Sequence, residues 1–516
     1  MYLSKFGYVI RKEDLDKDTI ESIKKDLTVV PLCDGKFGIQ GQNNYKSFIE
    51  TINKIYLPKM YGISRFGKPQ KYLDNYNGIE WENPHHFNGA LLDRQKEPSE
   101  KLIKSCKEDG GGILSLSTGF GKTFVCLYCI HKLATKCIVV VNKVPLMKQW
   151  VSEIKTFLPS VSVVQLQGNK YSEKDITNAD IVITMLQSVS KINYSKTLFD
   201  QFGCAVFDEC HNTSSKMFSK ALFKLCSRYT IGLSATPKRS DGCECVYKWH
   251  LGDFVYKDSG NATRNGLKTI VNVVNLSSQS GQYKEFFTEG NAPRIQFTTM
   301  ITHLTTEMQK RNELILYFVM CLAKDPLRKI LVLSDRREHL KILFSLLEKN
   351  KSKKDENTFG LFLGGMKNED LQKSRDSQII LATYSAFGEG VSEKDLNTLI
   401  LTTPKKYLGE NTKSGSKQES GKLEQVIGRI FRKDHMDCYP VIVDFCDDFS
   451  VYRSQSNQRN TFYRSKLNNK VIVKHKVSLD TPSFNVELQT SFCETEKNNV
   501  PKEDEKDEKI CIIEDD

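Results

Sequence analysis

A loop at residues 117–123 constrains this chain more than any other stretch. Residues 113–116 are typical of a buried strand, and residues 124–130 predict a helix packed on that strand. The loop between them consists of Ser117, Thr118, Gly119, Phe120, Gly121, Lys122 and Thr123. Backbone N–H groups in such a loop and the positive end of the helix dipole both favour negative charge. The sequence therefore predicts an anion site between a strand and a helix.

The side chains of this loop favour phosphate as the anion. Gly119 and Gly121 let the backbone approach phosphate oxygens closely. Lys122 supplies a positive charge for the β- and γ-phosphates of a nucleotide, and the Thr123 hydroxyl can ligate Mg²⁺. Leu116 occupies the place where the full phosphate-loop pattern has its first Gly. Taken alone, the loop also fits a simple Gly turn before a helix. Motifs elsewhere in the chain are needed to distinguish a phosphate site from such a turn.

Regular β/α alternation follows the loop. The apolar runs predicted to be strands are residues 136–141, 161–166, 180–184, 204–207 and 229–233. Continuous apolar runs are typical of strands buried on both faces. This alternation predicts an α/β fold with a doubly wound parallel sheet, whose ligands bind beyond the carboxyl ends of the strands.

Two carboxylates stand at the end of one of these strands. Asp208 can hold Mg²⁺ through its hydration shell, and Glu209 can polarise an attacking water. His211 would couple this site to a neighbouring element. After the next strand, the hydroxyls of Ser234 and Thr236 could hydrogen-bond back to this loop and transmit a change at the nucleotide. The alternative is a Ser/Thr turn before a proline.

A second α/β set begins after a polar, Gly-containing boundary at residues 258–266. Its predicted strands include residues 329–334, 378–383 and 398–403, and residues 300–323 are expected to be largely helical. We expect four parts along the chain: an N-terminal accessory domain at 1–85, a first core domain at 86–257, a second at 258–455, and a polar, partly disordered tail at 456–516.

A helix predicted at residues 423–432 carries three long polar side chains. Gln425, Arg429 and Arg432 are spaced i, i+4 and i+7, which places them on one helical face. Guanidinium groups aimed from one domain at a phosphate held by another can stabilise transferring charge. The alternative is an exposed basic helix face.

Gln95, at the start of a predicted helix, is a candidate reader of adenine. A Gln amide presents a donor and an acceptor side by side, and the ring of Phe87, eight residues earlier, could stack on a base. Without the phosphate loop downstream, an exposed Gln beside a core Phe would be the better interpretation.

Charge points to a polyanionic partner. The net charge is +12, but residues 502–516 hold eight acids and three lysines, net −5, so the other residues carry +17. Nucleic acid is the partner that such an excess favours, and a lysine-rich solubilising surface is the alternative.

Fifteen cysteines lack paired zinc-site spacing, and Cys126 and Cys129 are expected to pack in the core. We expect an intracellular protein with no signal peptide or transmembrane segment.

Four motifs stand in one order: the phosphate loop, Asp208 to His211, Ser234 to Thr236, and residues 425–432. That order resembles the superfamily 2 DExH-box helicases over residues 87–450. With residues 55–62 (Ile-Tyr-Leu-Pro-Lys-Met-Tyr-Gly), the chain resembles the poxvirus-type transcript-release helicases of large DNA viruses, which are related to XPB.

The resemblance implies two tandem RecA-like domains that bind ATP and Mg²⁺ between them. Lys122, Thr123, Asp208 and Glu209 would form the hydrolytic site, and Gln425, Arg429 and Arg432 would complete it. The strand-end residues implied to contact nucleic acid are Lys143, Pro145, Thr184, Gln187, Ser334, Arg336 and Thr383. The family often has Glu-Gly-x-Asp near Gly390, where this chain has Ser392. That difference puts the contact made by this Asp in doubt.

These expectations amount to an ATP-dependent helicase or translocase acting on DNA in viral transcription. The partners would be nucleic acid and a viral RNA polymerase, with the host cytoplasm, its virus factories and the virion as locations. An RNA helicase is one alternative, because such motors grip phosphates more than sugars. An ATP-gated scaffold that remodels a polymerase complex without separating strands is another.

Overall fold

The computed structural model contains two compact units, one of residues up to Asp258 and one of residues from Lys268 on. None of the helices in the described residues is long and apolar enough to cross a membrane. The structure describes residues 1–32, 44–69, 71–73, 76–117, 119–169, 171–195, 197–235, 239, 241–258, 268–290, 293–351, 357–388, 393, 395–407, 423–424, 426–431, 433, 435, 437–467, 469–492 and 510–511.

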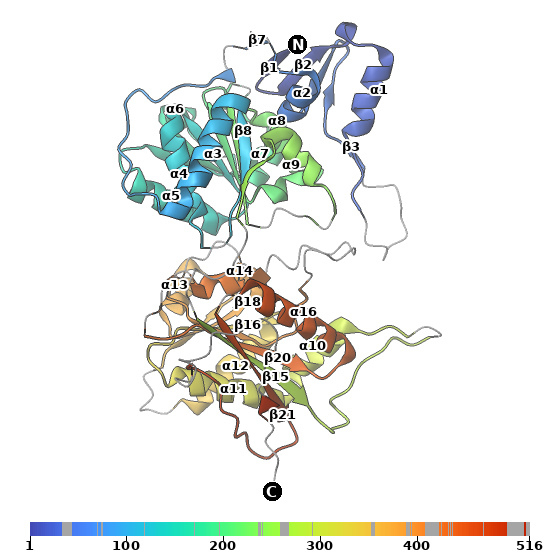
Figure 1. Cartoon of the computed structure of the whole chain (residues 1–516), viewed down its shortest axis with the longest axis vertical. Helices are drawn as coiled ribbons and strands as arrows, with labels where there is room; N and C mark the ends of the chain where they lie inside the picture. The colour runs from blue at the N-terminus through green and yellow to red at the C-terminus, as the bar shows by residue number, and fades with distance from the viewer. Residues whose placement is uncertain are drawn as a thin grey trace, which may run out of the picture. The chain divides into compact units, whose positions relative to one another are not determined.

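The first unit begins with a small sheet (Figure 1), which within the described residues has the order β5-β6-β2-β1-β7. Its strands pair antiparallel except for β1 and β7. The elements of this N-terminal part are β1 (Tyr2–Ser4), β2 (Gly7–Arg11), η1 (Lys12–Asp14), α1 (Lys17–Asp26), β3 (Thr28–Val29), β4 (Tyr45–Lys46), β5 (Ile49–Glu50), β6 (Lys54–Leu57), α2 (Lys59–Phe66) and β7 (Lys71–Tyr72).

A buried lysine fixes this small sheet to the rest of the unit. Lys59, at the start of α2, is 1% exposed. Its Nζ donates to the carbonyls of Gly110, Ser227 and Arg228 at 2.7, 2.9 and 2.8 Å. These carbonyls belong to the residues just before two core strands, so one ammonium group joins α2 to both of them. Burial lowers the pKa of Lys59 to about 8.

The core of the first unit is a parallel sheet with the order β10-β11-β9-β12-β13-β8-β14 among the described residues. Its strands are β8 (Gly111–Ser115), β9 (Cys137–Val141), β10 (Val163–Leu166), β11 (Ile181–Met185), β12 (Cys204–Asp208), β13 (Tyr229–Ser234) and β14 (Phe254–Lys257). The helices are α3 (Asp93–Asp109), α4 (Lys122–Leu133), α5 (Val144–Phe157), α6 (Glu173–Asn178), α7 (Leu186–Lys191), η3 (Cys210–Ser214), α8 (Ser219–Lys224) and α9 (Glu244–Leu251).

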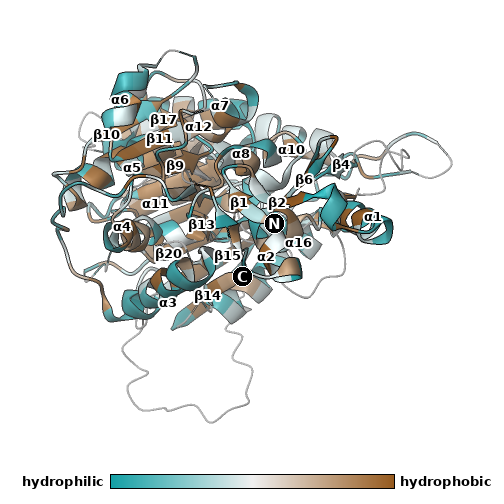
Figure 2. Cartoon of the chain, turned by 90° about the horizontal axis from the view of Figure 1, so that it is seen from above, coloured by the Kyte–Doolittle hydropathy of each residue, from teal (hydrophilic) through white to brown (hydrophobic). Residues whose placement is uncertain are grey.

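Helices cover both faces of this sheet, as Figure 1 shows. One buried cluster joins it to α3, α4 and α5, and includes Cys126 and Cys129, while a second joins it to α6, α7, α8 and α9. Hydrophobic colour in Figure 2 is concentrated on strands such as β9 and β11, and α3 is largely hydrophilic. Burial on both faces explains why β9 reads Cys-Ile-Val-Val-Val without alternation.

The second unit repeats the plan, with the order β17-β18-β16-β19-β20-β15-β21-β22 and parallel pairing in its described part. Its strands are β15 (Thr269–Ser277), β16 (Ile330–Ser334), β17 (Phe359–Phe362), β18 (Ile379–Thr383), β19 (Thr398–Leu401), β20 (Val441–Asp447), β21 (Lys470–Ser478) and β22 (Ile510–Cys511). Its helices are α10 (Phe297–Thr306), α11 (Gln309–Ala323), α12 (Arg337–Asn350), α13 (Asn368–Asp376), α14 (Tyr384–Gly388), η4 (Gly428–Phe431) and α16 (Ser450–Lys466).

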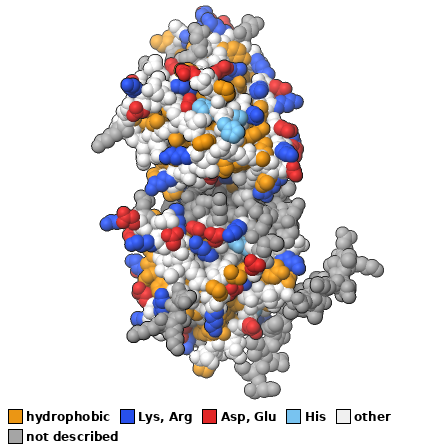
Figure 3. Space-filling model, turned by 90° about the vertical axis from the view of Figure 1, so that its left-hand side faces the viewer, with side chains coloured by type: hydrophobic (Ala, Val, Ile, Leu, Met, Phe, Trp, Pro, Cys, Tyr) orange, Lys and Arg blue, Asp and Glu red, His pale blue; other side chains and the backbone are white. Residues whose placement is uncertain are grey.

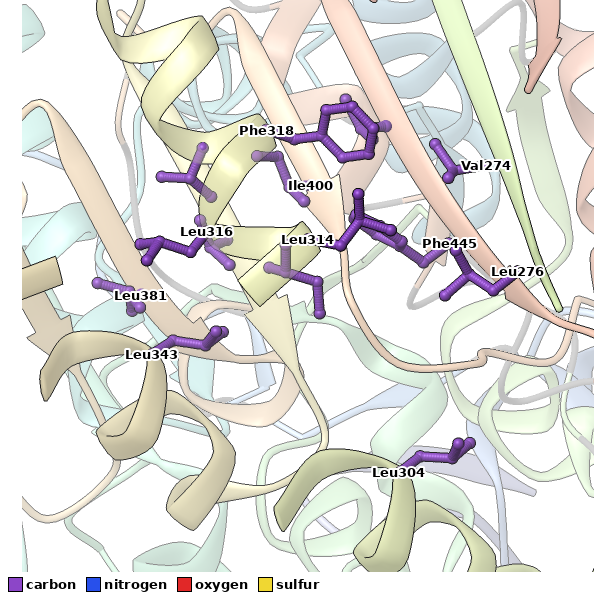
Figure 4. Close-up of a cluster of buried hydrophobic side chains, with 14 of the residues drawn as sticks. Val274, Leu276, Leu304, Leu314, Leu316, Phe318, Leu343, Leu381, Ile400 and Phe445 are labelled. Carbon is purple, nitrogen blue, oxygen red and sulfur yellow. The ribbon is translucent and has the colours of Figure 1, made fainter. Parts of the chain in front are cut away.

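A large apolar cluster holds α10, α11 and α12 on one face of the second sheet. Figure 4 shows Leu314 and Phe318 of α11 beside Ile400 and Phe445 of the sheet. A second cluster, which includes Phe387 of α14, covers the opposite face. The predicted fold class, two RecA-like α/β domains with a small N-terminal domain, is confirmed.

The end of the chain differs from the expected polar tail. The expected boundary at residue 456 lies inside α16, and β21 pairs with β15 along its whole length, from Thr269 with Lys470 to Ser277 with Ser478. The segment expected to be largely helical at 300–323 is so, and it consists of two helices, because α10 ends at Thr306 and α11 begins at Gln309.

Candidate active site

The loop between β8 and α4 has the backbone of an anion site. Gly119 and Gly121 have φ of +84° and +91°, in the left-handed region that favours glycine. A Cβ at Gly121 would lie 2.6 Å from Nε2 of Gln95, so a side chain there would also collide. No side chain among the described residues caps α4, whose first residue is Lys122, so the helix N-terminus keeps donors for an anion. Thr118 lies outside the described residues.

Lys122 and Glu209 form the central ion pair, with 2.7 Å between Nζ and Oε1. Burial opposes the charge of Lys122, but the carboxylates of Glu209 and Asp208 outweigh it and raise the pKa of the ammonium. Burial also disfavours the charged form of Glu209, but Lys122 and His211 outweigh it and lower the pKa of this carboxyl. Glu209 is therefore an ionised carboxylate at neutral pH.

The backbone at Glu209 has φ of +49°, which is uncommon for a residue with a side chain. It follows the last residue of β12, where the chain turns into η3. The second carboxylate oxygen, Oε2, is buried, makes no hydrogen bond within the described residues, and lies 3.4 Å from His211 Nδ1. One Glu209 oxygen thus holds the lysine, and the other has capacity to accept a proton or a hydrogen bond.

Asp208 is oriented by two donors. Trp150 Nε1–H of α5 donates to Oδ2 and the backbone N–H of Glu209 donates to Oδ1, both at 2.9 Å. Burial, as the largest cause, raises the pKa of Asp208. The sequence analysis missed Trp150, whose one signal was an indole donor on an apolar helix.

These residues fit Mg²⁺ chemistry. Magnesium is held in proteins by one or two carboxylates, with phosphate oxygens and waters as the other ligands. Asp208 is a buried carboxylate whose charge is only partly compensated, and Thr123 follows Lys122 at the start of α4. Within the part of the chain that the structure describes, no group of three or more His, Cys, Asp or Glu is arranged so that it could hold a metal ion.

The two strand-end loops of the first unit are in contact. His211 Nδ1 and Ser234 Oγ are hydrogen-bonded at 2.9 Å. Arg239, which the sequence analysis did not select, donates from Nη1 to the His211 carbonyl and pairs with the Asp241 carboxylate. This bond is consistent with the coupling role predicted for His211 and Ser234, which stays a prediction. Thr236 lies outside the described residues.

Gln95 lies against the phosphate loop. Its Nε2 donates to the Phe120 carbonyl at 2.8 Å, and its Oε1 accepts from the Leu92 N–H at 3.1 Å. Phe87 is half-buried among the rings of Phe124, Tyr128, His131 and Phe157. Packing accounts for Phe87, and backbone contacts engage both polar groups of Gln95. Their adenine contacts stay predictions.

The strand-end residues of the first unit divide by exposure. Pro145, in the first turn of α5, is exposed. Lys143, the residue directly before α5, is half-buried. Gln187 donates to the Asn142 carbonyl at 2.9 Å. Thr184 is fully buried and its hydroxyl donates to the Leu166 carbonyl. This conformation therefore does not present the Thr184 side chain to a nucleic acid.

In the second unit, Ser334 and Thr383 are buried and serve the backbone. Ser334 Oγ accepts from the Arg336 N–H and is hydrogen-bonded to His339 Nδ1. Thr383 Oγ1 accepts from the Ala386 N–H at the start of α14. Arg336 is half-buried and reaches the Thr298 carbonyl at 3.5 Å. The structure thus gives Ser334 and Thr383 local roles in place of exposed contacts.

The predicted arginine face differs from the expected continuous helix. Residues 428–431 form the 3₁₀ segment η4, and Arg429 within it is buried, with its guanidinium 5.4 Å from the centre of the Phe387 ring. A guanidinium packed on this ring is not presented outward in this conformation. Gln425, Arg432 and Gly390 lie outside the described residues.

Comparisons with known proteins agree on one family. Residues 88–239 match the family model described as type III restriction enzyme, res subunit. The chain is 31% identical over 482 residues to the "Putative ATP-dependent RNA helicase L396" of Acanthamoeba polyphaga mimivirus, covering 92% of this chain and 87% of that protein. It is 26% identical over 392 residues to the "Putative ATP-dependent RNA helicase QP509L" of African swine fever virus (isolate Pig/Kenya/KEN-50/1950), covering 73% of each.

A solved structure supports the fold. The ATP-dependent type ISP restriction-modification enzyme LlaBIII bound to DNA has a TM-score of 0.50 and 15% identity, over 76% of this chain and 32% of that one. The family is identified by the mimivirus relative, which matches over most of both chains, and the phosphate loop and the Lys122–Glu209 pair agree with it. The chain belongs to the superfamily 2 helicases, among the ATP-dependent helicases of large DNA viruses.

Proposed function

We propose that this helicase is a DNA translocase or unwinding motor that acts in viral transcription and hydrolyses ATP with Mg²⁺. The observation that carries the proposal is the ion pair of Lys122 with Glu209, set between the phosphate loop and the end of β12. The pair supports the proposal because it brings together a lysine suited to bind phosphate and a carboxylate suited to act as a general base, as nucleotide hydrolysis requires.

The pair also suggests an order of events. A bound triphosphate competes with Glu209 for the Lys122 ammonium, because its charge is larger than that of one carboxylate. Once Lys122 turns to the phosphates, Glu209 is released to accept a proton from the attacking water. Asp208, held by Trp150, would bind Mg²⁺ with Thr123, and the cation would neutralise charge on the phosphates.

Motion is proposed to follow from hydrolysis through the loop contacts. A change at Glu209 reaches Ser234 through His211, because His211 and Ser234 are hydrogen-bonded. Gln425 and Arg432 are proposed to complete the site from the second domain, and Lys143, Pro145, Gln187 and Arg336 are proposed to contact the strand. Cations and acids are interspersed on the face drawn in Figure 3. We propose that the contacts to the nucleic-acid backbone form a narrow track.

A second candidate is an RNA helicase, which the printed names of the two viral relatives favour. A viral RNA polymerase is the proposed protein partner in the transcription role, with virus factories and virions as the proposed locations. Contacts to the 2′-hydroxyl are what would let the site distinguish RNA from DNA.

The test is a side-by-side ATPase and strand-displacement assay with single-stranded DNA, duplex DNA and RNA. Wild type and Lys122→Ala are compared, because the variant removes the phosphate cation. We expect Mg²⁺-dependent hydrolysis stimulated most by DNA, and loss of hydrolysis in Lys122→Ala. Stronger stimulation by RNA would favour the second candidate. Hydrolysis without displacement, but with release of a stalled transcript, would favour a remodelling scaffold.

A further inference from the structure

The phosphate loop is attached to the point where the chain leaves the first unit. Asp258 directly follows β14, the edge strand of the first sheet. Its carboxylate Oδ2 accepts from the Ser117 hydroxyl and, at 3.3 Å, from the Ser117 backbone N–H. Ser117 is the first residue of the phosphate loop, and Asp258 lies 141 positions further along the sequence.

Backbone pairing leads Asp258 to this contact. Lys257 of β14 is in register with Ser115 of β8, and the Asp258 N–H donates to the Ser115 carbonyl at 2.8 Å. The ladder between the two strands therefore continues one residue beyond β14. On the other side, the Leu116 N–H donates to the Ser234 carbonyl at 3.1 Å. The first residues of the loop are thus held between the end of β13 and Asp258.

A carboxylate at this place is unexpected on electrostatic grounds. The loop and the start of α4 favour anions, and a fixed negative charge nearby opposes a triphosphate. Asp258 nevertheless takes up two donors of the loop. A role in shaping the loop explains this arrangement, because hydrogen bonds to a carboxylate are stronger and more directional than those between neutral groups.

We propose that Asp258 is a positioning residue that fixes the first residue of the phosphate loop and joins it to the chain segment leading into the second unit. It acts on nucleotide through Ser117. The inference rests on the proposed function, because it takes this loop as the ATP site. Asp258 is the last described residue of the first unit before the chain continues into the second.

The experiment measures equilibrium binding of mant-labelled ADP and the KM and kcat for ATP on the full-length chain. The variants are Asp258→Ala, Asp258→Asn, Ser117→Ala and the double variant Asp258→Ala with Ser117→Ala. Asp253→Ala is the matched control, because Asp253 directly precedes β14 and its carboxylate is exposed. This control removes the same charge from the same edge of the sheet.

We expect Asp258→Ala to weaken mant-ADP binding and raise the KM for ATP by about tenfold, with kcat changed by less than about threefold. Ser117→Ala should have a similar effect. The double variant should bind nucleotide no more weakly than the more affected single variant, because both substitutions remove the same contact. Asp258→Asn should weaken binding less than Asp258→Ala, since its amide oxygen still accepts from Ser117 but without the charge of a carboxylate. Asp253→Ala should match wild type.

Three results would overturn the inference: unchanged binding in Asp258→Ala, tighter binding in both Asp258 variants, or single effects that multiply in the double variant. Tighter binding would mean that charge repulsion dominates. If Asp258→Ala does not fold, as judged by its melting curve, Ser117→Ala and Asp258→Asn carry the test. Lys122→Ala distinguishes failure of the proposed function from failure of this inference. If Lys122→Ala binds mant-ADP like wild type, the proposed ATP site is wrong. If Lys122→Ala loses binding but the Asp258 variants bind like wild type, only the role of Asp258 is wrong.

Discussion

The two parallel sheets use carboxylates at their strand ends in opposite ways. In the first unit, Asp208 ends β12 and Glu209 follows it, and Glu209 has a buried oxygen without a hydrogen bond among the described residues. In the second unit, Asp447 ends β20, and both of its oxygens accept from the Arg311 guanidinium, at 2.8 and 2.9 Å. Neither side chain of the second pair is exposed.

The difference lies in the partner of each carboxylate. Lys122 belongs to a loop that can bind phosphate, so its pairing with Glu209 is exchangeable. Arg311 lies in α11 and also donates to the Thr402 carbonyl, so its pairing with Asp447 ties a helix to two strands. A carboxylate at the end of a central strand is thus proposed to serve chemistry in one unit and is used for architecture in the other. Activity and stability should separate when each carboxylate is changed.

The largest effect is expected from Glu209→Gln. The amide keeps the shape of the side chain but cannot accept a proton, so kcat for ATP should fall by about 10²–10⁴-fold. The free energy of unfolding should change little. Steady-state ATPase with saturating nucleic acid, together with thermal unfolding, checks both values. Wild-type hydrolysis by this variant would remove the chemical half of the contrast.

Asp447→Ala should have the opposite profile. It leaves the buried Arg311 charge without its partner, which typically costs about 3–5 kcal/mol. Hydrogen exchange followed by mass spectrometry should show faster exchange in β15 and β20, with β8 to β13 unchanged. The control is the double variant Arg311→Met with Asp447→Leu, which should recover most of the stability because no charge remains buried. Uniform exchange across both sheets would contradict independent roles for the two carboxylates.

Acid sharpens the comparison through His250 in α9. Burial lowers the pKa of this imidazole to about 3, and its Nε2 has no hydrogen-bond partner among the described residues. The unfolded chain takes up a proton near pH 6.5 and the folded chain does not, so stability is lost as the pH falls below 6.5. At pH 5 the loss is about 2 kcal/mol.

Replacing His250 with Leu should therefore reduce the loss of unfolding free energy between pH 7 and pH 5 by about this amount. His339 of the second unit is the contrasting case, because burial lowers its pKa but it is hydrogen-bonded to Ser334 and Asn312. His339→Leu should cost stability already at pH 7. Equal acid sensitivity of wild type and His250→Leu would exclude a neutral buried imidazole at this position.

Ser234→Ala is expected to have the smallest effect. It removes the hydrogen bond to His211, for which about 1 kcal/mol is typical, so stimulation of the ATPase by nucleic acid should fall about fivefold. The readout is the ratio of the rates with and without single-stranded nucleic acid. Ser190→Ala is a matched control, because Ser190 is another buried serine of the first unit, hydrogen-bonded to the Leu186 carbonyl. An identical drop in both variants would indicate a general loss of packing.

Sequence reasoning succeeded where local pattern and strand-end geometry determine position. The carboxyl ends of parallel strands meet at one edge of a sheet, so the loop with Lys122 and the end of β12 with Glu209 had to be close. The contacts of Trp150 and Asp258 with the site were not predicted, because they depend on how a helix or an edge strand lies in space. No spacing in the sequence reports such packing.

Other differences have similar causes. β21 contains five polar residues among its nine, as suits a strand near the edge of its sheet, so it lacked the continuous apolar run of a central strand. Thr184 and Ser334 stand at strand ends, but their hydroxyls satisfy nearby backbone or side-chain groups. Arg429 lies in a 3₁₀ segment, where the i, i+4 spacing of an α-helix does not apply.

Lys59 makes the attachment of the N-terminal part chemically visible. Its amine is shielded from solvent and held by three carbonyls, so an acylating reagent should react with it faster when α2 separates from β8 and β13. The rate at which Lys59 is labelled, relative to exposed lysines, therefore reports on this separation. A ligand or partner that loosens or tightens the attachment would be recorded at this single amine, without any engineered probe.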